Sequence, residues 1–208
     1  MRRTTRWRLT LGAAVASLAL VAAACGGGDD GAEPAASGGS AGGAATEATP
    51  FGPACADIPT SGSGSFESMM TAPVAAAAAE NPLLSSLVHD LDAAGLTDTL
   101  NGSDGLTVFA PTNMAFKAAA KADPEGTQAM MDDPEGAFAQ LLTYHVVEGQ
   151  IPPDQLAGSH TTLQGESLDI MGSGEDFTIN GMTHIVCGDI HTDNATVYII
   201  DEVLHPPA

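Results

Sequence analysis

The sequence predicts an α+β domain with a mostly antiparallel sheet, preceded by a long segment that does not fold with it. Two periodicities carry this prediction. Apolar residues between positions 73 and 145 mostly follow helical spacing, whereas those between positions 144 and 203 fall in short runs separated by Gly, Asn and Asp. Helices first and strands later are typical of α+β domains. A third observation sets the boundary: residues 26–54 are almost wholly small or polar.

The first half of the domain is expected to be helical. Residues 73–79 place a proline ahead of strong helix formers, which favours a helix that begins there. Residues 83–91 then carry leucine and valine at the i, i+4, i+8 spacing of an amphipathic helix, and Gly95 ends it. A short buried strand follows at residues 106–109.

Two further helix starts are marked by capping residues. Thr112 or Asn113 is placed to cap a helix that runs through Phe116. Asp133 followed by Pro134 opens another helix, because aspartate caps well and proline suits the first helical position. This helix has one apolar face, formed by Phe138, Leu141, Leu142 and His145.

Strands occupy the remainder of the domain, at residues 144–147, 160–163, 167–171, 176–179, 183–187 and 196–203. The last of them is apolar on both faces, which predicts a central strand covered on each side. Asp201 is the exception within it, because a buried carboxylate requires partners.

The N-terminus predicts export. Residues 1–24 combine four arginines with an apolar run of 16 residues, from Leu9 to Ala24. Because a membrane-spanning helix needs about 20 apolar residues, this segment is interpreted as a signal peptide. Ala22-Ala23-Ala24-Cys25 resembles the lipobox of bacterial lipoproteins, although Ala22 stands where Leu or Val is usual. We therefore expect cleavage before Cys25 and lipidation of its thiol; the alternative is an ordinary signal peptide with a free Cys25.

The mature chain is then expected to have two parts. Residues 25–54 form a disordered, lipid-anchored linker rich in Gly, Ala and Ser, because such a composition buries too little apolar surface to fold. Residues 55–208 form one domain of ordinary size. The predicted location is the extracellular face of the cell membrane, with a secreted form as the alternative.

Charge excludes one class of partner. The chain carries 26 acidic and six basic residues, for a formal net charge of −20. Without residues 1–24 only Lys117 and Lys121 remain basic, which gives 2 − 26 = −24. Such a surface repels phosphate backbones and anionic headgroups, so we expect no nucleic-acid binding and membrane attachment only through the N-terminal lipid.

Cys55 and Cys187 are the cysteines that remain beside Cys25. In an oxidising compartment two such cysteines usually pair, so we expect a disulfide; two separate buried thiols are the alternative.

Motifs for catalysis and metal binding are absent from the sequence. It contains no G-x-S-x-G, P-loop or H-E-x-x-H pattern, and its six histidines are scattered. We therefore predict no enzyme activity, no cofactor and no metal site. Asn101 and Asn194 match the N-glycosylation pattern, yet both are interpreted as turn residues.

Three ordered segments, residues 106–116, 142–147 and 194–204, closely resemble the conserved blocks and Tyr-His motif of the fasciclin (FAS1) domain. The resemblance covers residues 68–206. Within the family, residues 144–147, 162–165, 186–188 and 206–208 resemble the mycobacterial surface antigens of the MPT70 and MPB83 type. The resemblance implies a β-sandwich or wedge of about seven strands with flanking helices, and it supports the Cys55–Cys187 pairing.

Tyr144 and His145 are the candidate interaction residues. Within the family this motif resembles regions implicated in integrin binding and adhesion. The alternative, which we favour, is structural: His145 donates to the backbone and locks the first block against the second.

We predict that the protein is a non-enzymatic surface lipoprotein. Its domain is expected to mediate adhesion to an unidentified cell-surface or matrix protein or glycan. The alternative is a lipoprotein that binds a small lipid-like ligand in an apolar pocket, for which paired methionines such as Met69-Met70 and Met130-Met131 are suited.

Overall fold

The computed structural model describes residues 49–207. The predicted signal peptide (1–24), the lipidation at Cys25 and most of the linker (25–54) lie outside the described residues. The last six linker residues are described and contact the domain: Phe51 is buried and forms a backbone bridge with Gly188. The structured part of the chain therefore begins before residue 55.

Helices fill most of the first half of the described chain. They are η1 (Pro53–Asp57), α1 (Phe66–Met69), α2 (Val74–Glu80), α3 (Ser85–Ala93), α4 (Thr97–Gly102), α5 (Asn113–Ala122), α6 (Pro124–Asp132), the π-helical turn η2 (Pro134–Phe138), α7 (Ala139–Tyr144) and the later η3 (Pro153–Gln155). The strands are β1 (Leu106–Pro111), β2 (Val146–Glu148), β3 (Gly158–Thr161), β4 (Ser167–Ser173), β5 (Asp176–Ile179), β6 (Thr183–His191) and β7 (Ala195–Ile200).

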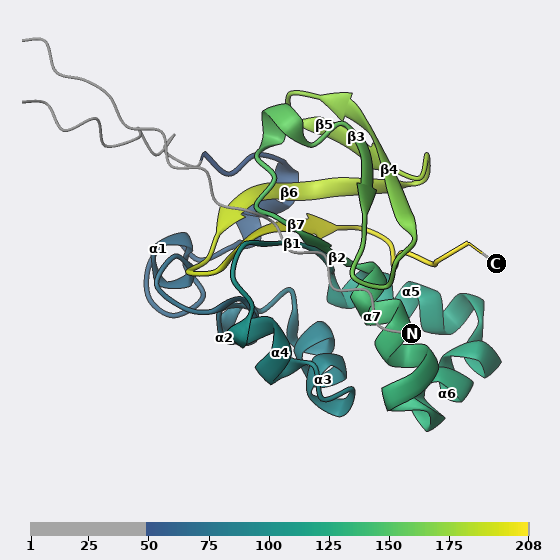
Figure 1. Ribbon diagram of the computed structural model, residues 1–208. Coiled ribbons are helices and arrows are strands. Elements are labelled where there is room, and N and C mark those ends of the chain that lie inside the picture. The colour runs from purple at the N-terminus through teal and green to yellow at the C-terminus, as the bar shows by residue number, and fades with distance from the viewer. Residues whose placement is uncertain (1–48, 208) are drawn as a thin grey trace, which may run out of the picture. The chain divides into compact units, whose positions relative to one another are not determined.

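The strands form one seven-stranded sheet in the order β2-β1-β7-β6-β5-β4-β3. Its neighbours are antiparallel except β1 and β7, which run parallel with Leu106 opposite Ala195 and Pro111 opposite Ile200. An isolated bridge between Val147 and Thr162 joins the β2 edge to the residue after β3, so the sheet curls over until its edges nearly meet. Figure 1 shows β3, β4 and β5 curled above the central strands, with the helices below. The α+β class and the seven strands are as predicted.

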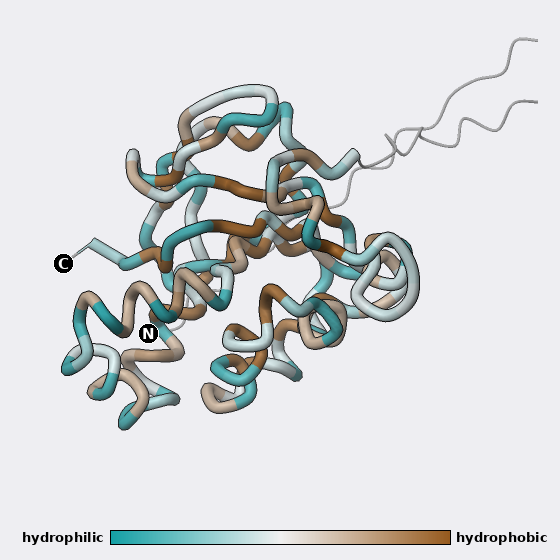
Figure 2. The backbone as a smooth tube through the Cα atoms, turned by 180° about the vertical axis from the view of Figure 1, so that it is seen from behind, coloured by the Kyte–Doolittle hydropathy of each residue, from teal (hydrophilic) through white to brown (hydrophobic). Residues whose placement is uncertain are grey.

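Two apolar cores lie on opposite faces of β1 and β7. Val108 and Val197 face a core that the helices cover, whereas Phe109 and Tyr198 face a core enclosed by the curled sheet. Every residue of β7 is buried, which confirms the predicted central strand. Figure 2 shows the hydrophobic stretches of the backbone concentrated along these central strands.

Several predicted boundaries differ from the structure. Strand β7 ends at Ile200, so the predicted strand over 196–203 is too long. Asp201 is exposed beyond its end and accepts a hydrogen bond from the His184 backbone N at 2.8 Å, which removes the expected cost of burying it. Tyr144 ends α7 rather than opening β2, because the helical turn continues through it.

Helix capping follows the sequence closely. The Thr112 hydroxyl accepts from the Ala115 backbone N and begins α5, and Asp133 accepts from the Ala137 backbone N at the start of η2. Helix α6 was not predicted, although Asp123 and Pro124 repeat the same start pattern. It buries none of its residues completely, and Met130 and Met131 are its large apolar side chains, so its sequence shows only a short apolar pattern.

Candidate functional site

Tyr144 is almost completely buried, with 1% of its surface exposed. Its hydroxyl donates to the Ser167 carbonyl oxygen at 3.2 Å and accepts from Asn180 Nδ2 at 3.1 Å. Asn180 lies in the turn between β5 and β6 in a left-handed conformation, and its Oδ1 accepts from the Asp169 backbone N. Tyr144 therefore fastens the end of α7 to the β4–β6 hairpins.

His145 is 2% exposed and forms hydrogen bonds through both ring nitrogens. Nε2 accepts from the Leu204 backbone N at 2.9 Å, so Nδ1 must carry the proton that it donates to the Leu141 carbonyl oxygen at 2.8 Å. The His145 carbonyl in turn accepts from the Phe109 backbone N at 2.8 Å. The residue thus joins the first conserved block to the end of the second.

Burial sets the charge state of His145. Removal from water disfavours the imidazolium and, despite the hydrogen bond to Leu141, lowers the pKa from 6.5 to about 4. A charged ring would also lose its acceptor and leave the Leu204 N–H without a partner.

We expect this pKa to make the domain less stable in mild acid. Between the folded pKa of about 4 and the unfolded value of 6.5, the unfolded chain binds more protons at His145, so stability rises with pH. The free energy of unfolding that depends on neutral His145 is fully present above the unfolded pKa. It falls by about 3 kcal/mol as the pH is lowered from the unfolded to the folded pKa.

Urea unfolding from about pH 7 to about pH 4.5 measures this dependence. A His145→Gln variant, neutral throughout, provides the comparison because its carboxylates are those of the native chain. The native chain and the variant should differ less in free energy of unfolding as pH falls. Equal dependence of the two proteins on pH would contradict the lowered pKa of His145.

The predicted partners Cys55 and Cys187 form a disulfide, with their Cα atoms 5.0 Å apart. The backbone next to the disulfide is also in close contact, at Gly52 and Val186. Gly52 has a φ of 104°, and a Cβ there would lie 2.5 Å from the Val186 carbonyl oxygen, so only glycine fits. The bridge and the Phe51–Gly188 pairing together hold the entering chain along β6.

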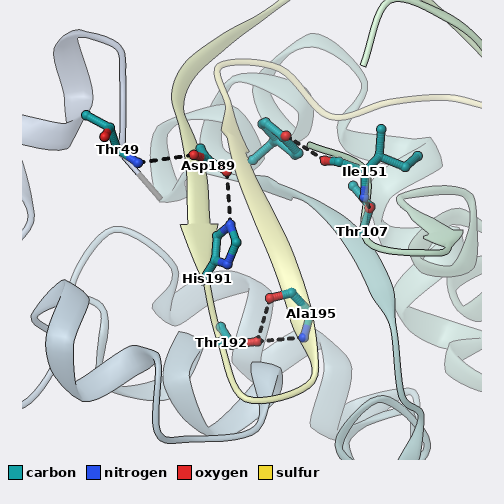
Figure 3. Close-up of polar contacts among 8 residues, drawn as sticks. Thr49, Thr107, Ile151, Asp189, His191, Thr192 and Ala195 are labelled. Atoms are coloured by element: carbon teal, nitrogen blue, oxygen red, sulfur yellow. Dashed lines mark hydrogen bonds and ion pairs between the residues drawn. The ribbon is translucent and has the colours of Figure 1, made fainter. Parts of the chain in front are cut away.

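A polar cluster holds the chain where it enters the domain (Figure 3). Asp189, at a bulge in β6 with a φ of 58°, accepts hydrogen bonds from the Thr49 backbone N at 3.2 Å and from His191 Nε2 at 3.0 Å. Elsewhere in the same view, the Thr107 hydroxyl accepts from the Ile151 backbone N at 2.9 Å. These contacts order backbone and bring no nucleophile and base together.

Asn194 has a larger structural role than its interpretation as a turn residue suggested. It is buried, its Oδ1 accepts from the Val74 backbone N at 2.8 Å, and its Nδ2 donates to the carbonyls of Leu100 and Ser103. It therefore connects α2, α4 and the start of β7. An asparagine next to a strand of apolar residues was the available signal, but sequence cannot show that its partners lie about a hundred residues away.

The surface of the helical half carries an apolar groove, which the sequence did not locate. Helices α3, α5, α6 and α7 and the C-terminal tail surround a volume of about 320 Å³. Within residues 49–207, no group of three or more His, Cys, Asp or Glu side chains is arranged to hold a metal ion. In the same range, no helix is both long and apolar enough to span a membrane.

A curled seven-stranded sheet with helices packed on one side defines a class of α+β domain. The fasciclin domain model matches residues 82–206, and the chain belongs to the fasciclin domain family.

Its similar relatives include mycobacterial surface antigens. The cell surface glycolipoprotein MPB83 of Mycobacterium bovis is 46% identical over 154 residues, which cover 71% of this chain and 66% of MPB83. The immunogenic protein MPT70 of Mycobacterium tuberculosis is 42% identical over 166 residues, 76% of this chain and 82% of that protein. The chain thus spans slightly less than two thirds of the length of MPB83.

A solved structure of a FAS1 domain pair from the insect cell adhesion molecule fasciclin I has the same fold. It superposes with a TM-score of 0.59 at 14% identity and covers 66% of this chain and 52% of that one. At this identity the likeness concerns the fold alone.

Proposed function

We propose that this chain is a non-enzymatic, exported surface protein, anchored through lipid on Cys25, whose fasciclin domain makes adhesive contacts with a cell-surface or matrix protein or glycan. Two similarities support the proposal: MPB83 is a cell surface glycolipoprotein, and the fold is that of a domain from an insect cell adhesion molecule.

The burial of Tyr144 and His145 argues against contacts through these two side chains. Both side chains are enclosed and committed to internal hydrogen bonds, so neither reaches a partner while the domain is folded. This observation carries the proposal that adhesion uses a different, exposed surface of the domain.

The best exposed apolar side chains of the sheet lie on its hairpins. Met171 on β4 is 57% exposed and Met182, in the turn before β6, is 71% exposed. The Met171 methyl group lies near Gly181, beside Met182. Methionine is enriched at protein interfaces and adapts its shape to a partner. The acidic charge of the chain additionally favours partners with basic surfaces.

Binding of purified protein to host envelope and matrix extracts tests the proposal. We expect a Met171→Lys, Met182→Lys double variant to bind at least about tenfold more weakly, because each buried ammonium at an interface is costly.

Met114→Lys is the control, since Met114 is 78% exposed, more than either methionine of the hairpins, but lies on α5. The control should bind as the native protein does. Equal losses in both variants, or no binding to either extract, would overturn the proposed surface; intact-mass analysis of Cys25 independently tests the anchor.

A further inference from the structure

The groove between the helices has the size and lining of a small-ligand site. Its volume of about 320 Å³ lies within the usual range of about 300–1,000 Å³ for ligand pockets. Apolar side chains from four helical elements and the C-terminal tail form most of its wall: Phe116, Met130, Met131, Phe138, Leu141 and Val203. Such a wall accepts an alkyl chain and offers few hydrogen bonds to a polar ligand.

The methionines make the opening adaptable. Met131 is 52% exposed at the groove, and Met130 beside it is half-buried. Both lie on α6, which buries none of its residues completely. Unbranched, polarizable side chains on such a helix adjust to apolar ligands of different lengths.

The groove also contains a cation without an ionic partner. Lys117 lines it from α5, and no carboxylate among residues 49–207 forms an ion pair with its ammonium group. Lys117 and Lys121 are the two basic Lys or Arg residues of the described domain, so the placement of one at an apolar groove is notable in a chain with 26 acidic residues.

The two carboxylates that line the groove, Asp90 and Asp123, already have interaction partners within the domain. Asp90 is 90% buried and contacts His89 Nδ1 at 3.4 Å, and burial raises the pKa of its carboxyl. Asp123 accepts from the Gly126 backbone N at 2.9 Å as the cap of α6. His205 lines the same groove from the C-terminal tail. An incoming head group therefore finds Lys117 as the group that still lacks a counter-ion.

The overall negative charge does not decide against an anion here. At physiological ionic strength charges are screened over about 8 Å, so the groups that line the groove dominate. A carboxylate beside Lys117 at the edge of an apolar wall gains a charge-assisted hydrogen bond while its tail leaves water.

We propose that this groove binds a single-chain amphiphile with an anionic head, of which a fatty acid is the simplest. The tail lies against Phe116, Phe138 and Val203, and the carboxylate pairs with Lys117. This site is separate from the hairpin surface proposed for adhesion, and each can fail without the other.

Titration calorimetry of the full chain with sodium dodecanoate, below the concentration at which micelles form, tests the proposal. We expect saturable binding of one equivalent. Lys117→Gln should weaken it about tenfold by removing the head-group partner. Ala120→Trp, which fills the groove from α5, should abolish it.

Lys121→Gln is the matched control. It removes the same charge from the same helix, one turn further on, from a side chain that does not line the groove. Its affinity should change less than twofold, and all variants should melt at the native temperature. Asp90→Asn should leave dodecanoate binding intact or strengthen it.

Three results would overturn the proposal. One is the absence of saturable dodecanoate binding to the native chain. Another is an equal effect of Lys117→Gln and Lys121→Gln, which would reduce the role of Lys117 to overall charge. The third is tighter binding of dodecylammonium that Asp90→Asn abolishes, because the site would then recognise a cationic head.

Discussion

Replacement of both Cys55 and Cys187 by alanine is expected to lower the free energy of unfolding by about 5 kcal/mol. The disulfide joins residues 132 positions apart, so it closes nearly the whole domain into a loop and restricts the unfolded chain accordingly. In the chain-entropy model a loop of that length corresponds to about 5 kcal/mol. For a domain of this size the melting temperature should fall by about 10–20 °C, measured by calorimetry in parallel with urea unfolding.

Reduction of the native protein is the internal control for this prediction. Treatment with dithiothreitol should bring the native melting temperature close to that of the double variant and leave the double variant unchanged. A Cys55→Ala single variant should match the reduced protein, because the remaining Cys187 is fully buried and acts as a small apolar side chain. A double variant as stable as the oxidised protein would show that the Phe51–Gly188 contacts alone hold the N-terminal segment.

Local signals in the sequence were sufficient for much of this fold. The caps at Thr112 and Asp133 act within one helical turn, so residue type alone identifies them. The continuous apolar run in β7 predicted burial on both faces, because a strand with one solvated face would alternate. Each of these features depends on neighbours in the sequence.

The remaining features depend on residues far apart. The parallel pairing of β1 with β7 joins residues 106–111 to 195–200, and no local pattern specifies it. The role of Asn194 rests on backbone groups of three residues in two distant segments, α2 and the end of α4. The groove arises where faces of α3, α5, α6 and α7 fail to meet, which periodicity within each helix cannot reveal. Helix α6 was missed because its large apolar side chains, Met130 and Met131, are adjacent and show no helical repeat.

The Tyr-His motif shows that a motif shared with a family can support the fold without lying on the surface. Tyr144 reaches the hairpins through hydrogen bonds of its hydroxyl with Ser167 and Asn180. The His145 ring reaches the C-terminal tail at Leu204, and the His145 backbone carbonyl reaches β1 at Phe109. A substitution in this motif would disturb every surface that these segments support. Loss of adhesion after such a substitution is therefore expected even if the motif never touches a partner.

His145→Ala is expected to lower the free energy of unfolding by about 4 kcal/mol and the melting temperature by about 10 °C. The change leaves the buried Leu204 N–H unpaired, which costs about 1–3 kcal/mol, and opens a cavity in place of the ring. Urea unfolding at neutral pH measures the loss, and amide hydrogen exchange should show reduced protection at Leu204.

The same variant distinguishes the structural from the adhesive interpretation of the motif. His184→Ala is the control, because its side chain is exposed and its hydrogen bonds with Asp201 are made by its backbone N and O, so its stability should change by less than about 0.5 kcal/mol. If His145 acts through the fold, partner binding by His145→Ala should recover in proportion to the folded fraction when temperature is lowered. Native stability combined with lost binding would instead make His145 a contact residue, and would require the domain to open around it.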